Sequence, residues 1–361
     1  MAGDRQANLP PPNPLQSLVN GVVLAAIVGW VLYVGKSVFV PIVMATLVVY
    51  VIVGVTRLLA RIPVVGAALP QPLRYTLAIL GSVAALAMIA FVALDNLEKF
   101  AARSPQYQAS LLATIQKLAV RFGVQDEPTW ATLRQVFLEQ VSLQRLIGST
   151  VAIATSIVGV AIVVFLYVTF LLIEQRMFSA KIDNLSGDPR NAVRIRQIID
   201  GTSTRIGSYL AIKAMLGLLS ALISFAIMRY FGLEFAAFWA MLIVLLNFVP
   251  YIGSFLSVFL PATMAVVQFG DFGTVVSLLA LLAFVQFGIG NFLDPYLLGN
   301  SLNLSPFAIL VSLTIWTGLW GIPGAFLAVP ITAIMAILFS EFGGTRPVAV
   351  LLSRSGTLSG D

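Results

Sequence analysis

Apolar residues in this chain fall in long blocks, without the strict alternation of strands or the one-sided stripe of soluble helices. Six blocks have about the length of one bilayer crossing, near 20 residues; they occupy 18–34, 38–58, 73–94, 149–173, 205–228 and 273–293. Lipid offers no partner to unpaired backbone groups, so such blocks cross a membrane as helices. The pattern predicts an all-α fold, a polytopic integral membrane helical bundle.

Two further apolar stretches, 235–269 and 306–339, are too long for one straight crossing. Each would measure about 50 Å as a helix, against a hydrocarbon core of about 30 Å. Each is interrupted near its middle, at Pro250-Tyr-Ile-Gly253 and at Gly321-Ile-Pro-Gly324, where proline removes a backbone donor. We expect each stretch to be either a kinked, tilted crossing or a re-entrant hairpin, which makes about eight transmembrane segments in total.

The blocks also predict how the chain is organised. We expect a disordered, proline-rich tail over 1–14, followed by three transmembrane helices over 15–94. An amphipathic helical insert over 95–148 separates them from a transmembrane transport core over 149–342. A C-terminal tail occupies 343–361. Only Gly35-Lys36-Ser37 joins the first two helices, which predicts a tight antiparallel hairpin. The insert either lies on the membrane or a neighbouring subunit, or forms a cap outside the membrane.

Composition supports a lipid environment and narrows the chemistry. Charged residues make up 10% of the chain, hydrophobic residues make up 59%, and the mean hydropathy is +0.97, whereas soluble domains carry about 25% charged residues. Cysteine and histidine are absent, which excludes disulfides, thiolate or imidazole metal sites, and Ser-His-Asp catalysis. We find no facing pair of carboxylates at membrane depth for aspartyl chemistry. We therefore expect no enzyme activity and no cofactor.

The distribution of basic residues predicts the orientation. The net charge is +6, but the bases lie in loops that flank apolar blocks, so we expect no nucleic-acid partner. Only Lys36 and Arg229 occupy the short loops on one side. Many more bases lie on the other side, namely Arg5, Arg57, Arg61, Arg74, Arg176, Lys181, Arg190, Arg194, Arg196, Arg205, Arg346 and Arg354. Because positive loops stay inside, both termini are predicted to be cytoplasmic.

Candidate transport residues gather around the two breaks. Irregular backbone at membrane depth is tolerated where it is buried or lines a cavity, and its free N–H and C=O groups can bind polar solutes or ions. The alternative is that the breaks are proline kinks used for packing alone. The candidates at the breaks and on the approach to the second one are Asn247, Pro250, Tyr251, Gly253, Gln286, Asn291, Asp294, Pro323 and Gly324.

Two charged residues have two interpretations each. Lys213 lies about two turns into the block 205–228, on the same helical face as Arg205 and Tyr209. It either extends towards the cytoplasmic interface or lines the pathway. Asp294 would cost ~3 kcal/mol or more inside the hydrocarbon unless it is paired or hydrated, and it would be ordinary as an interfacial cap.

The C-terminal half resembles the autoinducer-2 exporter family of bacterial permease-like proteins. The resemblance covers about 205–342 strongly and 1–95 in pattern only. It rests on Asn247-Phe-Val-Pro250-Tyr-Ile-Gly253 with Pro261, Asp294-Pro295 with Gly299, Pro306, and Gly321-Ile-Pro-Gly324-Ala-Phe-Leu-Ala-Val-Pro330. It implies a multi-pass protein of the bacterial inner membrane that works as a homo-oligomer. Many relatives have a carboxylate or another polar residue at the position of Asp294.

The leading hypothesis from residues and resemblance together is a transporter that exports a small polar solute, with the quorum-sensing signal autoinducer-2 as the named candidate. The first alternative is a sodium(lithium)/proton antiporter that uses Asp294 and carries a monovalent cation. The second is a structural membrane scaffold, because kinked helices also pack bundles.

Overall fold

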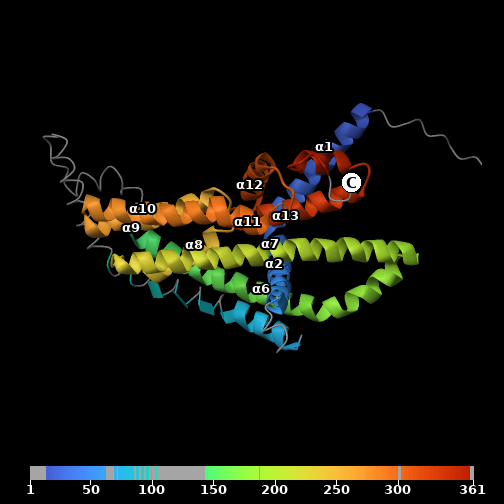
Figure 1. The fold of residues 1–361 in the computed structure, drawn as a ribbon. Helices are drawn as coiled ribbons and strands as arrows, with labels where there is room; N and C mark the ends of the chain where they lie inside the picture. Colours follow the sequence, from blue (N-terminus) through green and yellow to red (C-terminus); the bar gives the residue numbers. More distant parts are fainter. Residues whose placement is uncertain are drawn as a thin grey trace, which may run out of the picture.

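A computed structural model describes residues 14–61, 69–70, 72–84, 143–186, 188–299 and 302–357, together with 87–88, 91–92, 95–96, 99 and 103. These residues are almost wholly helical (Figure 1). The named helices are α1 (Pro14–Val34), α2 (Lys36–Arg61), α6 (Leu143–Ser186), α7 (Pro189–Tyr230), α8 (Ala236–Leu246), α9 (Ile252–Phe269), α10 (Phe272–Gly288), the π-helix η1 (Ile289–Leu293), α11 (Asp294–Leu298), α12 (Pro306–Trp320), α13 (Ile322–Glu341) and α14 (Arg346–Leu352). Almost all of the predicted tail over 1–14, and most of the predicted insert over 95–148, lie outside the described residues.

The described helices confirm a polytopic helical membrane protein. Five helical stretches are long and apolar enough to cross a bilayer: Lys36–Arg57, Pro189–Tyr230, Ile252–Phe269, Phe272–Leu298 and Ile322–Glu341. Shorter apolar helices accompany them at Val19–Val34, Ile162–Glu174, Ala236–Leu246 and Pro306–Trp320. Many large apolar side chains on these helices are exposed, among them Trp30, Phe284 and Phe307. Such a surface suits lipid contact.

Helices α6 and α7 are much longer than the predicted blocks. They contain 44 and 42 residues, or about 65 Å each, roughly twice the hydrocarbon thickness. The stretch between the two apolar blocks is itself helical, and only residues 187–188 separate the two helices (Figure 1). The Asp188 carboxylate accepts a hydrogen bond from Arg190 N and caps α7, and Arg196 forms an ion pair with Asp183 across the hairpin. Hydropathy located the apolar halves and missed these polar extensions.

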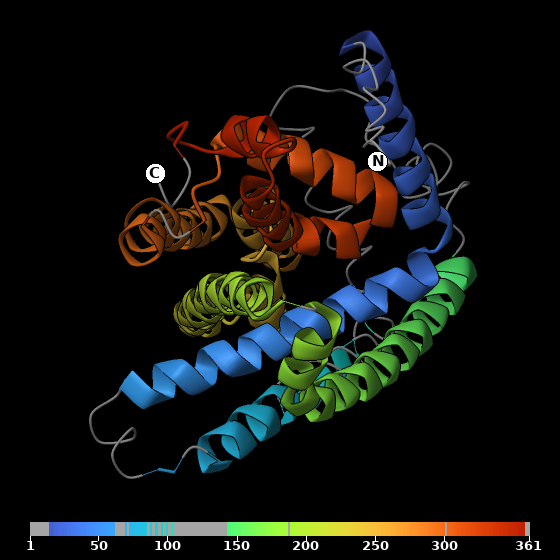
Figure 2. The same ribbon diagram turned by 90° about the vertical axis from the view of Figure 1, so that its right-hand side faces the viewer.

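The predicted antiparallel hairpin of α1 and α2 is wrong. The two helices diverge from Gly35 at a wide angle (Figure 2). Helix-like hydrogen bonds continue through the junction, from Gly35 N to Val31 O at 2.8 Å and from Phe39 N to Gly35 O at 3.0 Å. The chain therefore bends at Gly35 without reversing.

Both broken stretches are helical hairpins, and the alternative of a kinked crossing is excluded. At the open end of the α8–α9 hairpin, the Gln268 side chain accepts a hydrogen bond from Glu234 N at 2.7 Å and donates one to Gly232 O at 2.9 Å. In the α12–α13 hairpin, Trp316 Nε1 donates to Thr332 Oγ1 at 3.3 Å. Helix α8 has 11 residues, about 16 Å, too short to cross a 30 Å core.

A glycine lets the two arms of each hairpin touch. A Cβ atom placed on Gly253 would lie 1.8 Å from Leu246 O, and one on Gly324 would lie 1.8 Å from Trp316 O. These separations are far below van der Waals contact, so any larger residue would force the arms apart. Gly253 and Gly324 were predicted as pathway residues, and the structure gives them a packing role at the hairpin turns.

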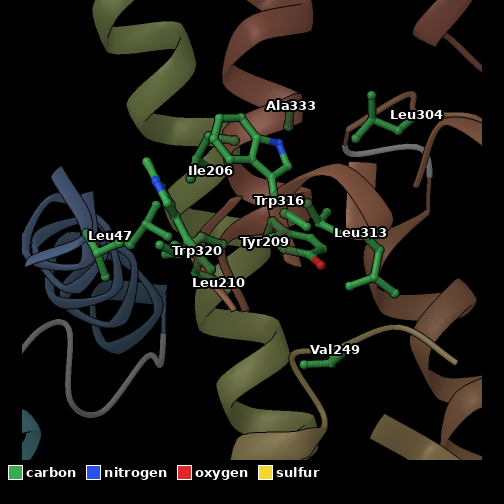
Figure 3. Close-up of a cluster of buried hydrophobic side chains, with 14 residues drawn as sticks. Leu47, Ile206, Tyr209, Leu210, Val249, Leu304, Leu313, Trp316, Trp320 and Ala333 are labelled. Carbon is green, nitrogen blue, oxygen red and sulfur yellow. The ribbon is translucent and has the colours of Figure 1, made fainter. Parts of the chain in front are cut away.

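The main apolar cluster joins α2, α7, α12 and α13 (Figure 3). The rings of Trp316 and Trp320 lie 5.0 Å apart, and Trp320 Nε1 donates to Leu32 O at 2.9 Å. Both indole N–H groups are thus satisfied, as buried tryptophans require. Val249, which lies in the first hairpin turn, belongs to the same cluster as Tyr209 of α7. This packing fixes α7 against both hairpins, which positions the site described next.

Candidate functional site

An ion pair joins two helices that are distant in sequence. Lys213 Nζ of α7 lies 2.5 Å from Asp294 Oδ2 at the start of α11. The side chains are only 9% and 22% exposed, so the pair is largely removed from solvent. Lys213 therefore does not extend to an interface, and Asp294 is not a solvated cap. Each charge makes the burial of the other tolerable, since an unpaired buried charge is strongly destabilising.

The backbone before Asp294 is adapted to place this carboxylate. The segment η1 is a π-helix in which Asp294 N donates to Ile289 O, five residues back. Pro295 follows and has no N–H to offer. π-Helical turns insert an extra residue into a helix, change the direction of the side chains that follow, and are frequent at functional sites. Here the change of direction brings Asp294 to α7.

The pair borders a cavity of about 830 Å³ between α7, the α8–α9 turn, α10 and the chain around residues 302–306. This volume would hold a small metabolite. Seven of the ten predicted pathway residues line it: Lys213, Asn247, Pro250, Tyr251, Gln286, Asn291 and Asp294. Gly253, Pro323 and Gly324 are absent from the described lining, because they serve the hairpin turns.

Some lining residues were not among the ten predicted pathway residues. Tyr209, Asn303 and Arg354 supply polar groups to the cavity, and Phe255 and Phe259 supply stacked rings 5.3 Å apart. Tyr209 was recognised only as sharing a helical face with Lys213. Nothing in the sequence pattern links Arg354, beyond the last predicted transmembrane block, to residues of α7.

Two oxygens that belong to lining residues are shielded from solvent and have no hydrogen-bond partner among the described residues: Asn247 Oδ1 and Asp294 Oδ1. Buried acceptors are rarely left unsatisfied, because losing water without a replacement costs about 1–3 kcal/mol. Both oxygens accept hydrogen bonds only, as amide carbonyl and carboxylate oxygens do. Once their side chains turn towards the cavity, these oxygens would suit a ligand that presents hydroxyl, amine or other donor groups, or a cation.

The remaining amides are partly engaged within the protein. Gln286 Nε2 donates to Ser220 Oγ at 3.0 Å across α10 and α7, and Asn291 Nδ2 donates to Phe287 O at 3.1 Å within its own helix. Both amides line the cavity and retain a carbonyl oxygen that can accept. The donors hold the side chains in place, and the oxygens remain for a ligand.

The first hairpin turn is strained at the cavity wall. Tyr251 has φ 60° and ψ −59°, a region that residues with a Cβ atom seldom occupy. Such backbone costs of order 1–3 kcal/mol and is often found at functional sites. Tyr251 is 56% exposed and lines the cavity, so tight burial of its ring does not account for the conformation.

Comparison with known proteins agrees with this architecture. The model of the family described as "AI-2E family transporter" matches residues 22–343, which include the ion pair, the cavity and both hairpins. The chain belongs to the AI-2E transporter family. Members of this family are transporters and permeases of the lipid bilayer, so the activity that membership implies is transport and not catalysis.

The relatives have similar names and limited identity. One relative is a protein of Borreliella burgdorferi whose name assigns it to transport only provisionally. It is 34% identical over 199 residues, which span 55% of each chain. The AI-2 transport protein TqsA of Escherichia coli is 26% identical over 76% of this chain and 79% of its own. YhhT of the same organism, whose transport name is also provisional, is 27% identical over 78% and 80%. These identities support the family and leave the solute open.

Proposed function

We propose that this protein moves a small polar solute across the membrane through the cavity beside the Lys213–Asp294 pair. The observation that carries the proposal is a buried ion pair at the wall of a metabolite-sized cavity, next to two acceptor oxygens without partners. A bundle that served only as scaffold would gain nothing from unsatisfied buried acceptors, which cost stability. A solute with donor groups would satisfy them during passage.

We further propose that the solute is rich in hydroxyl groups and that the direction is export. Hydroxyl groups can donate to Asn247 Oδ1 and Asp294 Oδ1 while their own oxygens accept from Lys213, and the Phe255–Phe259 stack offers an apolar wall. Autoinducer-2 is the candidate that the name of TqsA supplies.

Cation/proton antiport is the second candidate, and the Asp294 oxygen without a partner is the specific observation in its favour. Asp294 has one oxygen on Lys213 and one without a partner, so a sodium or lithium ion could compete with a proton for the free oxygen. Lys213 opposes this function, since its positive charge 2.5 Å away repels a cation. Solute transport therefore has the stronger support.

The wider setting follows from charge and family. We propose a bacterial inner-membrane protein with both termini in the cytoplasm, because the polar half of α7 carries Arg190, Arg194, Arg196 and Arg205 and such charges stay inside. We also propose a homo-oligomer, which rests on the resemblance to the family and not on the charges.

The test is flux in proteoliposomes. Purified protein would be assayed with radiolabelled autoinducer-2, ribose and erythritol as tracers, beside empty liposomes. A pH-sensitive dye would report proton movement after addition of sodium or lithium. We expect faster flux of at least one tracer, and no cation-driven pH change. A pH change without tracer flux would favour antiport. The absence of both would favour a structural scaffold and overturn the proposal.

A further inference from the structure

A second, smaller cavity lies next to the first. It has a volume of about 130 Å³, and its walls come from the polar half of α7, the end of α13, and α14; among its lining residues are Thr202, Arg205, Ser340 and Glu341. Leu302 and Asn303 line both cavities. Of two successive residues after α14, Ser353 lines the small cavity and Arg354 lines the large one. These four residues form a partition between the cavities.

The partition is held by a small set of hydrogen bonds between two short segments. Leu304 and Ser353 form an isolated antiparallel bridge. Ser305 N donates to Leu352 O at 2.9 Å, and Arg354 N donates to Asn303 O at 3.0 Å. The Asn303 side chain adds a bond from its Nδ2 to Thr357 O at 2.9 Å, and its Oδ1 accepts from Ser355 Oγ at 3.2 Å.

These contacts are suited to opening. The pairing is a single bridge without the neighbouring ladder of a sheet, and all four residues 354–357 are exposed. Exposed backbone bonds with few buried apolar contacts open at low free-energy cost. Asn303 has φ 46°, a left-handed conformation that asparagine tolerates better than most residues. Leu304 is buried in the main cluster and Leu352 packs against it, so the part that can move is the exposed run that follows Ser353.

We propose that residues 353–357 form a gate between the two cavities, and that the solute passes from one cavity to the other when their pairing with 303–305 breaks. This inference rests on the proposed function, because a gate has meaning only where something moves. The small cavity leads to the polar half of α7, so the gate stands at the end of the pathway that carries the positive charge. Arg354 moves with the gate, so its positively charged guanidinium group leaves the large cavity when the gate opens.

A reversible disulfide tests the gate. The bonds flank Leu304 and Ser353, which makes them a non-hydrogen-bonded antiparallel pair with Cα atoms about 4.5 Å apart, within the range for a disulfide. The chain has no cysteine of its own. In the double variant Leu304→Cys with Ser353→Cys, oxidation should reduce tracer flux at least tenfold, and dithiothreitol should restore it. Each single variant should be insensitive to oxidant.

Failure of the gate and failure of transport give different results. If mass spectrometry confirms the disulfide and the flux of the reduced protein nevertheless persists after oxidation, the gate is overturned and the transport function still stands. Absence of flux in the reduced and unaltered proteins would overturn the proposed function instead.

A labelling assay tests the gate without any solute. Ser254→Cys places a small reporter thiol on the wall of the large cavity, and a membrane-impermeant methanethiosulfonate cation is added to one face of vesicles at a time. Asn303→Ala removes the two side-chain bonds and should raise the labelling rate at least fivefold, the factor for one ordinary hydrogen bond, from one face only. An unchanged rate from both faces, or an equal rise from both, would contradict the gate.

Discussion

Lys213 and Asp294 lie 81 positions apart in sequence, yet their charged atoms are 2.5 Å apart. The contact links α7 to the helical segment that follows the π-helix, on the wall of the large cavity. A pair buried to this degree gains less than its Coulomb energy suggests, because both charges lose water. Its clearest effect on stability should therefore appear when one partner is removed.

Removal of either charge alone should cost about 3 kcal/mol of unfolding free energy, since an uncompensated charge remains buried. Lys213→Met and Asp294→Leu are the variants. The double variant should recover most of this loss, because no charge is left unpaired. Thermal unfolding in detergent micelles measures all four proteins as a double-mutant cycle. Additive losses in the cycle would show that the pair is not coupled.

Alanine at Gly253 or Gly324 should destabilise the hairpins. Each Cβ would lie 1.8 Å from a carbonyl oxygen of the opposite arm, and forced overpacking costs typically 1–3 kcal/mol or more. Gly318 is the matched control, because it lies in α12 and nothing stands within 4 Å of its Cβ position. Gly318→Ala should be neutral or stabilising by up to about 1 kcal/mol. Equal melting temperatures for all three variants would contradict the close approach.

Glycine at position 251 should give a more stable protein than alanine does. Both substitutions remove the Tyr251 ring, so the difference between them isolates the backbone. Since φ is 60° and ψ is −59°, alanine should keep a strain of roughly 1 kcal/mol that glycine relieves. Chemical denaturation in micelles compares the two variants. In regular secondary structure, alanine is usually more stable than glycine. If the alanine variant were the more stable one here too, the turn would be unstrained.

The start of α10 should weaken in acid. Hydrogen bonds from the backbone and side chain of Thr274 hold the pKa of Asp271 below its ordinary value of 3.8. A lowered folded-state pKa contributes stability that is present above pH 4 and is lost as the pH falls through the folded value. Asn also caps helices but does not titrate in this range. Asp271→Asn should therefore lose less stability than the unaltered protein between pH 4 and pH 2, as measured by thermal unfolding.

Much of the fold could be predicted from apolar block length and from proline and glycine. The two breaks at Pro250 and Gly321 fall where the blocks are interrupted, because local backbone chemistry decides helix continuity. Hydropathy could not reveal that the charged stretch between 174 and 205 is helical, since a helix outside the membrane needs no apolar run. The direction taken at Gly35 depends on what α1 and α2 pack against, which no local pattern contains.

The candidate site was partly predictable for a related reason. Polar residues in apolar surroundings are conspicuous, so Lys213, Asn247, Gln286 and Asp294 could each be singled out from the sequence alone. Their mutual distances depend on the packing of α7 against α10 and η1. Arg354 had no such contrast, because it follows the last apolar block in a polar tail, and the pairing of its segment with residues 303–305 brings it to the cavity.

The most direct test of the account is solute flux through the double variant Lys213→Met with Asp294→Leu, in proteoliposomes matched for protein content to the unaltered chain. The variant should keep most of its thermal stability, as argued above, so a change in flux would report on the pathway and not on folding. We predict that tracer flux falls at least tenfold. Flux at the rate of the unaltered protein would contradict the claim that solute passes beside this ion pair.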